Sequence, residues 1–322
     1  MRVLVSDPLI AGYLDEPSWE VLGRRSEAEV LSRLPEVDVL VASRVTAEMA
    51  AAASRLRLLH VPGAGLDKVA FDALAPEVTV CNTFHHGRSI AEHVVMVSLM
   101  LSRRVLFADR MLRQGTWASV SVDSSTPVGA TLAGRTLGVV GLGEIGCAVV
   151  RALAALGVRA QAVRRNPVVP EGLALDRVAD MSGLDALLST SDIVVLTVPL
   201  TESTAGMVDA RRLGLMRRDA VLVNVARGGL VDEDALFDAL SGGRIGGAAL
   251  DVWWGHPKDG AGVKGYTRPF ELLDNVVLTP HNSGHTYETF AGRAAEIRAN
   301  VARFAAGEPL TNVVRAGLGW EN

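Results

Sequence analysis

The chain has 322 residues, of which 49% are hydrophobic and 21% are charged, and its formal net charge is −4. This length is sufficient for two domains of ordinary size, and the composition is typical of a packed globular protein rather than a disordered one. The small negative charge gives no general attraction to nucleic acid or to an anionic membrane surface, so we expect neither as a partner, and any anion-binding site has to be local.

The first third of the chain alternates short β-branched runs with helical patterns. The opening residues, MRVLVSDP, predict a strand and a turn rather than a signal peptide, because the stretch is short and acidic. Strands separated by helical patterns indicate a parallel sheet with right-handed crossovers. We expect strands here at residues 2–6, 38–42, 57–61 and 78–82.

A long helical pattern follows, from Ser89 to about Gln114. It contains the most apolar stretch of the chain, residues 94–101. That stretch is far shorter than the roughly 20 residues that a membrane span needs, so it predicts a buried helix. Residues 115–135 are rich in Gly, Ser and Thr, lack helical periodicity and predict a surface connection.

The alternation of strands and helices restarts after this connection. A final helix is expected at 286–306, where apolar residues recur at a spacing of three to four. The two series predict two doubly wound α/β domains: residues 1–98 with 286–322, and residues 99–285. The strands expected in the second series are 136–140, 159–163, 192–198, 220–226, 247–252 and 275–280.

The segment TLGVVGLGEIG places Gly141, Gly143 and Gly146 in G-x-G-x-x-G order between a predicted strand and a predicted helix. In this context the motif is typical of a dinucleotide-binding loop, where the glycines allow a tight turn, close approach of the pyrophosphate and close helix packing. The backbone N–H groups of Glu144, Ile145 and Gly146 would then hold the phosphates. The alternative is that the glycines serve only a tight turn.

Two arginines, Arg164 and Arg165, follow the second strand of this series. Arg164 lies 23 residues after Gly141 (164 − 141), close to where such folds place an acidic residue on the ribose 2′-OH, about 20 residues on. Guanidinium groups at this point favour a 2′-phosphate, which predicts NADP as the cofactor and NAD as the second choice. The alternative is an exposed arginine pair without a ligand.

The chain has only two cysteines, Cys81 and Cys147. They have neither metal-ligand spacing nor the pattern of a disulfide framework, so we expect no metal site and a reducing, cytoplasmic location.

Residues 221–240 (VLVNVARGGLVDEDALFDAL), 248–252 (AALDV) and 278–284 (LTPHNSG) closely resemble the D-isomer-specific 2-hydroxyacid dehydrogenases. That family includes D-lactate, glycerate, phosphoglycerate and formate dehydrogenases, with phosphite dehydrogenase as a relative. The resemblance covers nearly the whole chain. It implies a Rossmann cofactor domain inserted in a flavodoxin-like substrate domain.

The resemblance also implies the catalytic residues, with Arg227 as the catalytic arginine and His281 as the acid/base. Hydride transfer to a 2-oxo acid puts negative charge on the carbonyl oxygen, which a guanidinium stabilises, and an imidazolium delivers the proton near neutral pH. Each residue also has a structural alternative when it is taken alone. Arg227 would then only shape the helix start in its Gly-flanked turn, and His281 would only cap a loop.

Other site residues are implied in the same way. Backbone N–H groups at Ala64 and Gly65 are expected to hold the substrate carboxylate, with Asn82 nearby. Cofactor contacts are expected from Pro199, Thr204, the backbone of Ala226, the side chain of Asp251, Ser283 and Gly284.

The chain departs from the family at residue 256 (227 + 29), where relatives carry a Glu before a Pro and this chain has His256. Formate dehydrogenases also lack that Glu and have a tryptophan-containing stretch similar to the one at Trp253. A histidine at this position can orient His281 but cannot supply negative charge. The alternative is that His256 lies outside the site.

The loop at residues 82–93 is longer than in the formate dehydrogenases and adds His85, His86 and Arg88. One interpretation is a second anionic group on the substrate, bound by Arg88 and a histidine. The other is a solvated polar loop.

These residues predict an NADP(H)-dependent enzyme that reduces a 2-oxo acid to the D-2-hydroxy acid. The enzymatic alternative is oxidation of formate or phosphite, and the non-enzymatic alternative is a dinucleotide-sensing binding protein. We also expect a homodimer, because a helix as apolar as residues 94–101 needs more cover than one domain usually offers.

Overall fold

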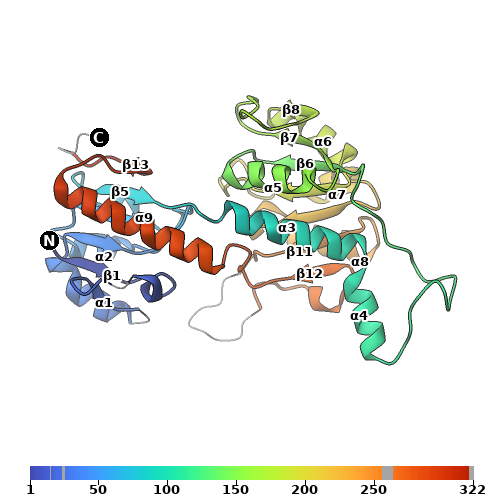
Figure 1. Ribbon diagram of the computed structural model, residues 1–322, viewed down its shortest axis with the longest axis horizontal. Coiled ribbons are helices and arrows are strands. Elements are labelled where there is room, and N and C mark those ends of the chain that lie inside the picture. The colour runs from blue at the N-terminus through green and yellow to red at the C-terminus, as the bar shows by residue number, and fades with distance from the viewer. Residues whose placement is uncertain (15, 24–25, 256–263, 319–322) are drawn as a thin grey trace. The chain divides into compact units, whose positions relative to one another are not determined.

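The structure is a computed structural model that describes residues 1–14, 16–23, 26–255 and 264–318 (Figure 1). The chain forms two compact units: unit 1 comprises residues 1–85 and 285–322, and unit 2 comprises residues 86–284. Both units have parallel sheets, which confirms the predicted α/β fold class. The first crossing between units lies earlier than the sequence suggested, because helix α3 (Gly87–Ser102) packs on α5 (Glu144–Ala154) of unit 2.

Unit 1 contains a six-stranded sheet in the order β13-β5-β4-β3-β1-β2. Neighbouring strands are parallel except for β13, which runs antiparallel to β5. The order of the parallel strands, 2-1-3-4-5, is the flavodoxin-like one. The four predicted strands are confirmed, whereas the short edge strands β2 and β13 lack the pattern that would have revealed them. The strands are β1 (Val3–Val5), β2 (Glu20–Val21), β3 (Val39–Val41), β4 (Leu58–Val61), β5 (Thr79–Asn82) and β13 (Val313–Arg315).

Helices cover both faces of the unit 1 sheet. Helices α1 (Glu27–Arg33) and α2 (Ala47–Ala52) pack on one face, and α9 (Tyr287–Ala306) packs on the other. Helix α9 confirms the predicted final helix, and its apolar stripe is buried as expected. Single 3-10 turns complete the unit: η1 (Ala11–Tyr13), η2 (Leu34–Glu36) and η3 (Phe71–Ala73).

Unit 2 contains a seven-stranded parallel sheet in the order β12-β11-β10-β9-β6-β7-β8. The strand order reverses between β6 and β9, and doubly wound sheets bind ligands beyond the carboxyl ends of their strands at such a switch point. All six predicted strands are confirmed; β8 was not predicted. The strands are β6 (Thr136–Val140), β7 (Arg159–Val163), β8 (Arg177–Ala179), β9 (Ile193–Leu196), β10 (Val221–Asn224), β11 (Gly247–Leu250) and β12 (Val276–Leu278).

The unit 2 sheet is buried between two layers of helices. Helices α3 and α5 cover one face, and three shorter helices cover the other. These shorter helices are α6 (Leu184–Thr190), α7 (Ala210–Leu215) and α8 (Glu233–Ser241). The 3-10 turns are η4 (Met181–Gly183), η5 (Gly228–Leu230) and η6 (Phe270–Leu272).

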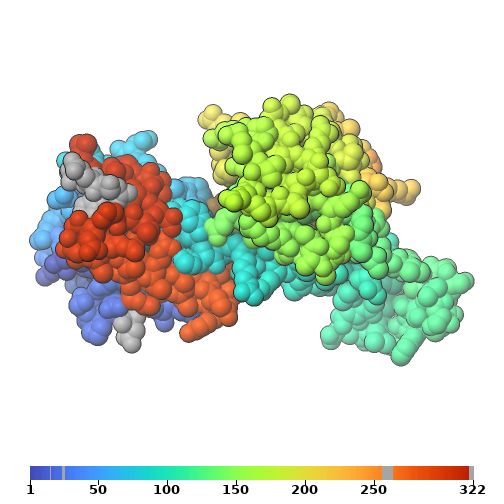
Figure 2. Space-filling model, turned by 45° about the horizontal axis from the view of Figure 1, so that its top comes forward, coloured from blue at the N-terminus to red at the C-terminus, as the bar shows by residue number. Residues whose placement is uncertain are grey.

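The helix expected from Ser89 to about Gln114 is two helices. Arg104, with φ 54°, adopts the left-handed conformation and ends α3, after which α4 (Val105–Arg113) begins in a new direction. The predicted connection, residues 115–135, is confirmed, because no helix or strand lies between α4 and β6 (Thr136–Val140). Its first part projects with α4 from the rest of unit 2 (Figures 1 and 2), and it returns at Ala130, whose N–H donates to the Ser102 carbonyl at 2.8 Å.

In the described ranges, none of the helices combines the length and the apolar character required to cross a lipid bilayer.

Candidate active site

The three glycines of the β6–α5 turn have distinct steric roles. Gly141 has φ 100°, and a Cβ there would lie 2.7 Å from the Val198 side chain after β9. A Cβ on Gly146 would lie 2.2 Å from the Gly141 carbonyl oxygen. By contrast, a Cβ on Gly143 would meet no atom within 4 Å among the residues described. The turn therefore needs Gly141 and Gly146 for its own packing, while Gly143 leaves its side open for the approach of a ligand.

This open side lies at the start of α5, where the helix has its positive end. Gly143 is the N-cap residue and has no side chain to cover the first N–H groups, which belong to Glu144, Ile145 and Gly146. Uncovered N–H groups at a helix start form an anion site. The Glu144 carboxylate turns toward the start of α3, where a Cβ on Gly87 would lie 2.9 Å from its Oε1.

The arginine pair follows β7 directly. The Gly141 N–H donates to the Val163 carbonyl at 2.8 Å, so Arg164 is the first residue beyond the point where β7 meets the glycine turn. Its Nη1 donates to the Val168 carbonyl at 2.7 Å, and Arg165 is exposed. A guanidinium has five N–H donors, so Arg164 retains donors for an anion.

The loop after β9 contains Pro199 and Thr204. The Thr204 hydroxyl donates to the Pro199 carbonyl at 2.8 Å and accepts from the Thr201 N–H at 2.8 Å. These bonds close the loop into a compact turn beyond the carboxyl end of β9, at the switch point of the sheet.

Arg227 follows β10 in a turn that is held by Asn224. The buried Asn224 amide donates to the Arg227 carbonyl at 2.9 Å, and its Oδ1 accepts from the Ala226 N–H at 3.1 Å. The next residue has to be glycine, because a Cβ on Gly228 would lie 2.3 Å from the Trp253 backbone. Sequence analysis missed Asn224, although an Asn at a strand end just before the arginine was the available signal.

Asp251 and His281 follow the adjacent strands β11 and β12. The Asp251 carboxylate is buried and accepts three bonds: from the Thr279 hydroxyl at 2.6 Å, the Asn282 N–H at 2.9 Å and the Ser283 N–H at 3.0 Å. The three bonded residues lie on both sides of His281 in the chain, and His281 itself has φ 58°. Arg227, Asp251 and His281 thus follow three neighbouring strands at one edge of the sheet.

A second histidine, which sequence analysis did not select, lies near this carboxylate. Burial lowers the pKa of His93 on α3, and the negative charge of Asp251 acts in the opposite direction. The lowered pKa favours the neutral form of His93 in this part of unit 2.

In unit 1, the expected carboxylate loop follows β4. The Asn82 amide at the end of β5 donates to the Ala64 carbonyl at 3.2 Å, which ties this loop to the neighbouring strand. Gly65 is exposed, so its N–H group lies on an accessible stretch of backbone.

The three residues of the longer loop have different surroundings. In unit 1, His85 has φ 60° and its Nε2 lies 2.6 Å from Glu296 Oε2 on α9. In unit 2, His86 is buried at the start of α3, and the exposed Arg88 donates to Glu92 one turn further on, at 3.0 Å. His85 therefore belongs with α9 of unit 1, and His86 and Arg88 belong with α3 of unit 2.

His256 lies outside the described residues. Within the described ranges, no group of three or more His, Cys, Asp or Glu side chains is arranged to hold a metal ion.

The chain is similar to known proteins both within unit 2 and over nearly its full length. The sequence model of the D-isomer specific 2-hydroxyacid dehydrogenase NAD binding domain matches residues 95–283. The glyoxylate reductase of Thermococcus onnurineus is 36% identical over 320 residues, covering 96% of this chain and 92% of that protein. The D-3-phosphoglycerate dehydrogenase of Mycobacterium tuberculosis is 35% identical over 329 residues, covering 99% of this chain. The chain spans only 60% of the length of that second relative.

Solved structures are similar over both units. An acyclic imino acid reductase in complex with NADPH and D-Arg matches with a TM-score of 0.81 and 27% identity, covering 98% of this chain and 100% of that one. A formate dehydrogenase of Granulicella matches with a TM-score of 0.77 and 27% identity, covering 95% of this chain and 82% of that one.

Proposed function

The chain belongs to the D-isomer specific 2-hydroxyacid dehydrogenases, and on this premise we propose that it reduces a 2-oxo acid to the D-2-hydroxy acid with NADPH. One observation carries the proposal. Arg227, Asp251 and His281 follow the neighbouring strands β10, β11 and β12, at the sheet edge where the glycine turn follows β6.

The residues of unit 2 fit a nicotinamide dinucleotide. The open side of Gly143 and the first N–H groups of α5 suit the pyrophosphate, and Arg164 suits a 2′-phosphate. A carboxylate has about four acceptor positions, so the three bonds of Asp251 leave one for the nicotinamide amide. We further assign cofactor contacts to Arg165, Pro199, Thr204, Ala226, Ser283 and Gly284. When bound, the dinucleotide supplies the hydride.

The protein's own residues stabilise charge and deliver a proton. The Arg227 guanidinium binds the carbonyl oxygen and stabilises the negative charge that develops on it. His281 donates a proton to the same oxygen. In unit 1, the backbone N–H groups of Ala64 and Gly65 bind the substrate carboxylate, and Asn82 supports that loop.

We also propose that the substrate carries a second anionic group, bound by Arg88. His86 is buried, whereas His85 and Arg88 are both exposed and each pairs with a carboxylate, His85 with Glu296 and Arg88 with Glu92. Arg88 is the better anion contact of the two, because its guanidinium is always charged and its side chain is 91% exposed. Phosphate, phosphonate and a distal carboxylate share the required chemistry.

The test is NADPH oxidation over a panel that includes glyoxylate, hydroxypyruvate, phenylpyruvate and a phosphorylated 2-oxo acid, repeated with NADH. We expect turnover with at least one 2-oxo acid and a preference for NADPH. Turnover with none of them would reject the reductase assignment, and a preference for NADH would reject the cofactor assignment.

Oxidation of formate or phosphite is the second candidate. It is supported by the similarity to a solved formate dehydrogenase over 95% of this chain. Reduction of NADP by formate or phosphite, in the absence of 2-oxo acid reduction, would establish it. Failure of both reactions, with retained dinucleotide binding, would favour the non-enzymatic alternative.

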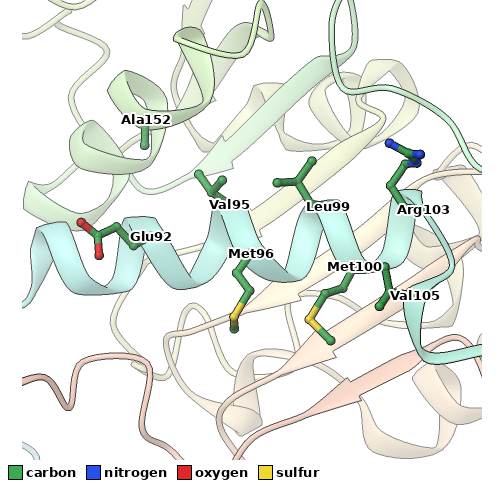
Figure 3. A pocket seen from close by; sticks show the side chains of 8 residues that line it. All are labelled: Glu92, Val95, Met96, Leu99, Met100, Arg103, Val105 and Ala152. Atoms are coloured by element: carbon green, nitrogen blue, oxygen red, sulfur yellow. The ribbon is translucent and has the colours of Figure 1, made fainter. Parts of the chain in front are cut away.

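We propose that the protein is a homodimer whose interface is formed by α3, α4 and the arm, defined here as residues 114–131. A groove of about 660 Å³ runs along α3. Figure 3 shows Met96 and Met100 on one side of α3 and Val95 and Leu99 on the other, facing Ala152 of α5. Met96 and Leu99, which lie on opposite sides of α3, are both exposed, so the described part of unit 2 covers this apolar helix incompletely.

The arm supplies matching apolar surface. Trp117, Val122 and Val128 are 68%, 69% and 75% exposed, respectively, and the first part of the arm projects from the rest of unit 2 (Figures 1 and 2). A second copy of the chain satisfies both surfaces at once, because a two-fold axis presents arm and groove to each other reciprocally.

Light scattering at micromolar concentration tests this assembly. We expect twice the 34.0 kDa mass of one chain. Leu99→Glu should yield monomers, whereas Leu272→Glu, which changes an exposed leucine elsewhere in unit 2, should not. A monomeric wild-type protein would reject the proposal.

A cytoplasmic location is proposed as well. Cys81 and Cys147 are buried free thiols, which suits a reducing compartment. Fractionation of the source cells tests it, and recovery from outside the cytoplasm would contradict it.

A further inference from the structure

The segment that carries His281 has an unusual backbone. Strand β12 ends at Leu278, and His281 follows within three residues at φ 58°. This left-handed conformation is uncommon for a residue with a side chain and persists only where its surroundings impose it. The side-chain direction of His281 therefore depends on the contacts that hold the residues on either side of it.

The N-terminal side of this segment is held at Thr279. Its N–H donates to the Leu250 carbonyl at 2.9 Å, its hydroxyl donates to Asp251 at 2.6 Å, and its carbonyl accepts from the Trp253 indole N–H at 3.0 Å. All three polar groups of Thr279 thus form hydrogen bonds with the last residue of β11 or with the three residues that follow it. The following residue, Pro280, has no N–H to contribute.

The C-terminal side is held at residues 282 and 283. Asp251 accepts both N–H groups, and the Ser283 carbonyl accepts from the buried Ser89 hydroxyl of α3 at 2.7 Å. His281 is therefore bracketed by fixed residues on both sides.

Trp253 and Trp254 form a natural comparison. Both are half-buried and both donate an indole N–H to a backbone carbonyl, Trp253 to Thr279 and Trp254 to Val231 at 2.7 Å. Both also pack on aromatic rings, Trp253 on Tyr266 and Trp254 on Phe270. Only the bond from Trp253 reaches the His281 segment.

We propose that Trp253 is a positioning residue that holds His281 in its strained conformation for proton transfer. The proposal rests on the acid/base role assigned to His281 above. A proton donor has to lie within about 2.6–3.2 Å of its acceptor, and a misplacement of about 1 Å costs up to roughly a hundredfold in rate. The Trp253 bond limits this displacement because it fixes the carbonyl two residues before His281.

The experiment compares Trp253→Phe with Trp254→Phe. Each variant loses one indole N–H and keeps an aromatic ring. We expect kcat to fall about tenfold to a hundredfold in Trp253→Phe, with the Kd for NADPH unchanged because the glycine turn is intact. Trp254→Phe should keep wild-type kcat. Equal kcat values in the two variants would overturn the proposal, since a merely structural role would affect both alike.

Amide hydrogen exchange provides a readout that does not depend on turnover. The Asn282 and Ser283 amides should exchange faster in Trp253→Phe than in wild type or Trp254→Phe. If the wild-type enzyme reduces no 2-oxo acid, the proposed function fails, and the exchange rates still decide whether Trp253 holds the segment. Unchanged exchange in Trp253→Phe would overturn the proposal.

Thr279→Val is the second variant, for use if Trp253→Phe does not fold. It keeps the shape of the side chain and removes the bond to Asp251. We expect a lower kcat and faster exchange at residues 282 and 283. Wild-type values for both would show that the anchoring of Thr279 does not control His281.

Discussion

Units 1 and 2 share a doubly wound plan but use their buried polar groups differently. In unit 2, Asn224 and Asp251 hold loops at the carboxyl ends of strands, next to Arg227 and His281. In unit 1, the buried His60 on β4 faces Asn300 on α9, and Asn300 binds Thr311, just before β13. The same fold thus stabilises the loops of the proposed catalytic residues in one unit and the segment before β13 in the other.

This difference shows that the fold alone does not determine which unit carries the reactive side chains. A parallel sheet offers a ligand edge in each unit, but side chains suited to proton and charge transfer follow the strands of unit 2. Unit 1 offers mainly backbone groups at the corresponding edge. Substitutions in unit 2 should therefore change the rate, and those in unit 1 should change affinity or stability.

The largest effect is expected from a pair of substitutions, one in each unit. His281→Ala should lower kcat by about 10²–10⁴-fold, because it removes the proposed proton donor. Asn82→Ala should mainly raise KM, because it releases the Ala64 loop. Steady-state kinetics measures both, and an equal fall of kcat in the two variants would contradict the division of roles.

Acid should destabilise unit 1 through His60. Burial lowers the pKa of its imidazole from 6.5 to about 4. The unfolded chain binds a proton below pH 6.5 that the folded chain excludes, so stability falls as the pH drops from 6.5 toward 4, by up to about 3 kcal/mol. Urea unfolding at pH 7 and pH 4.5 measures this change. His60→Gln should reduce the pH dependence, and an unaltered dependence would exclude His60 as its source.

The cofactor preference can be tested at the arginine pair of unit 2. Arg164→Asp should weaken NADPH binding about tenfold to a hundredfold, because a charge-assisted contact contributes roughly 1.5–3 kcal/mol, while NADH binding is kept or improved. Arg165→Asp should have the smaller effect, because Arg164 is the first residue beyond β7. Titration of both dinucleotides measures these affinities, and equal losses for NADH and NADPH would contradict a 2′-phosphate site.

The smallest effect is expected at Arg88. Its side chain is 91% exposed and already pairs with Glu92, so a further anion gains about 1 kcal/mol or less. Arg88→Ala should raise KM a few-fold for a doubly anionic 2-oxo acid and leave it nearly unchanged for a simple one. Equal effects on both substrates would show that Arg88 only shapes the loop.

Local patterns predicted much of this molecule. β-branched runs located ten strands, and the apolar spacing located α9, because both depend on neighbouring residues. The glycine turn was equally readable, since the left-handed φ of Gly141 and the tight packing at Gly146 require glycine. The edge strands β2, β8 and β13 were missed, because their residues are partly exposed and they lack the continuous apolar run of the buried strands.

The sequence by itself determined the two-domain α/β plan, the glycine turn and the position of Arg164 after β7, because each is encoded within a short stretch of chain. Only the tertiary structure decided that α3 belongs with unit 2, that Asp251 brackets His281, and that His85 pairs with Glu296. Asp251 and Ser283 are 32 residues apart, and His85 and Glu296 are 211 residues apart. Such pairs form only when the fold brings distant segments together, so no local pattern reveals them.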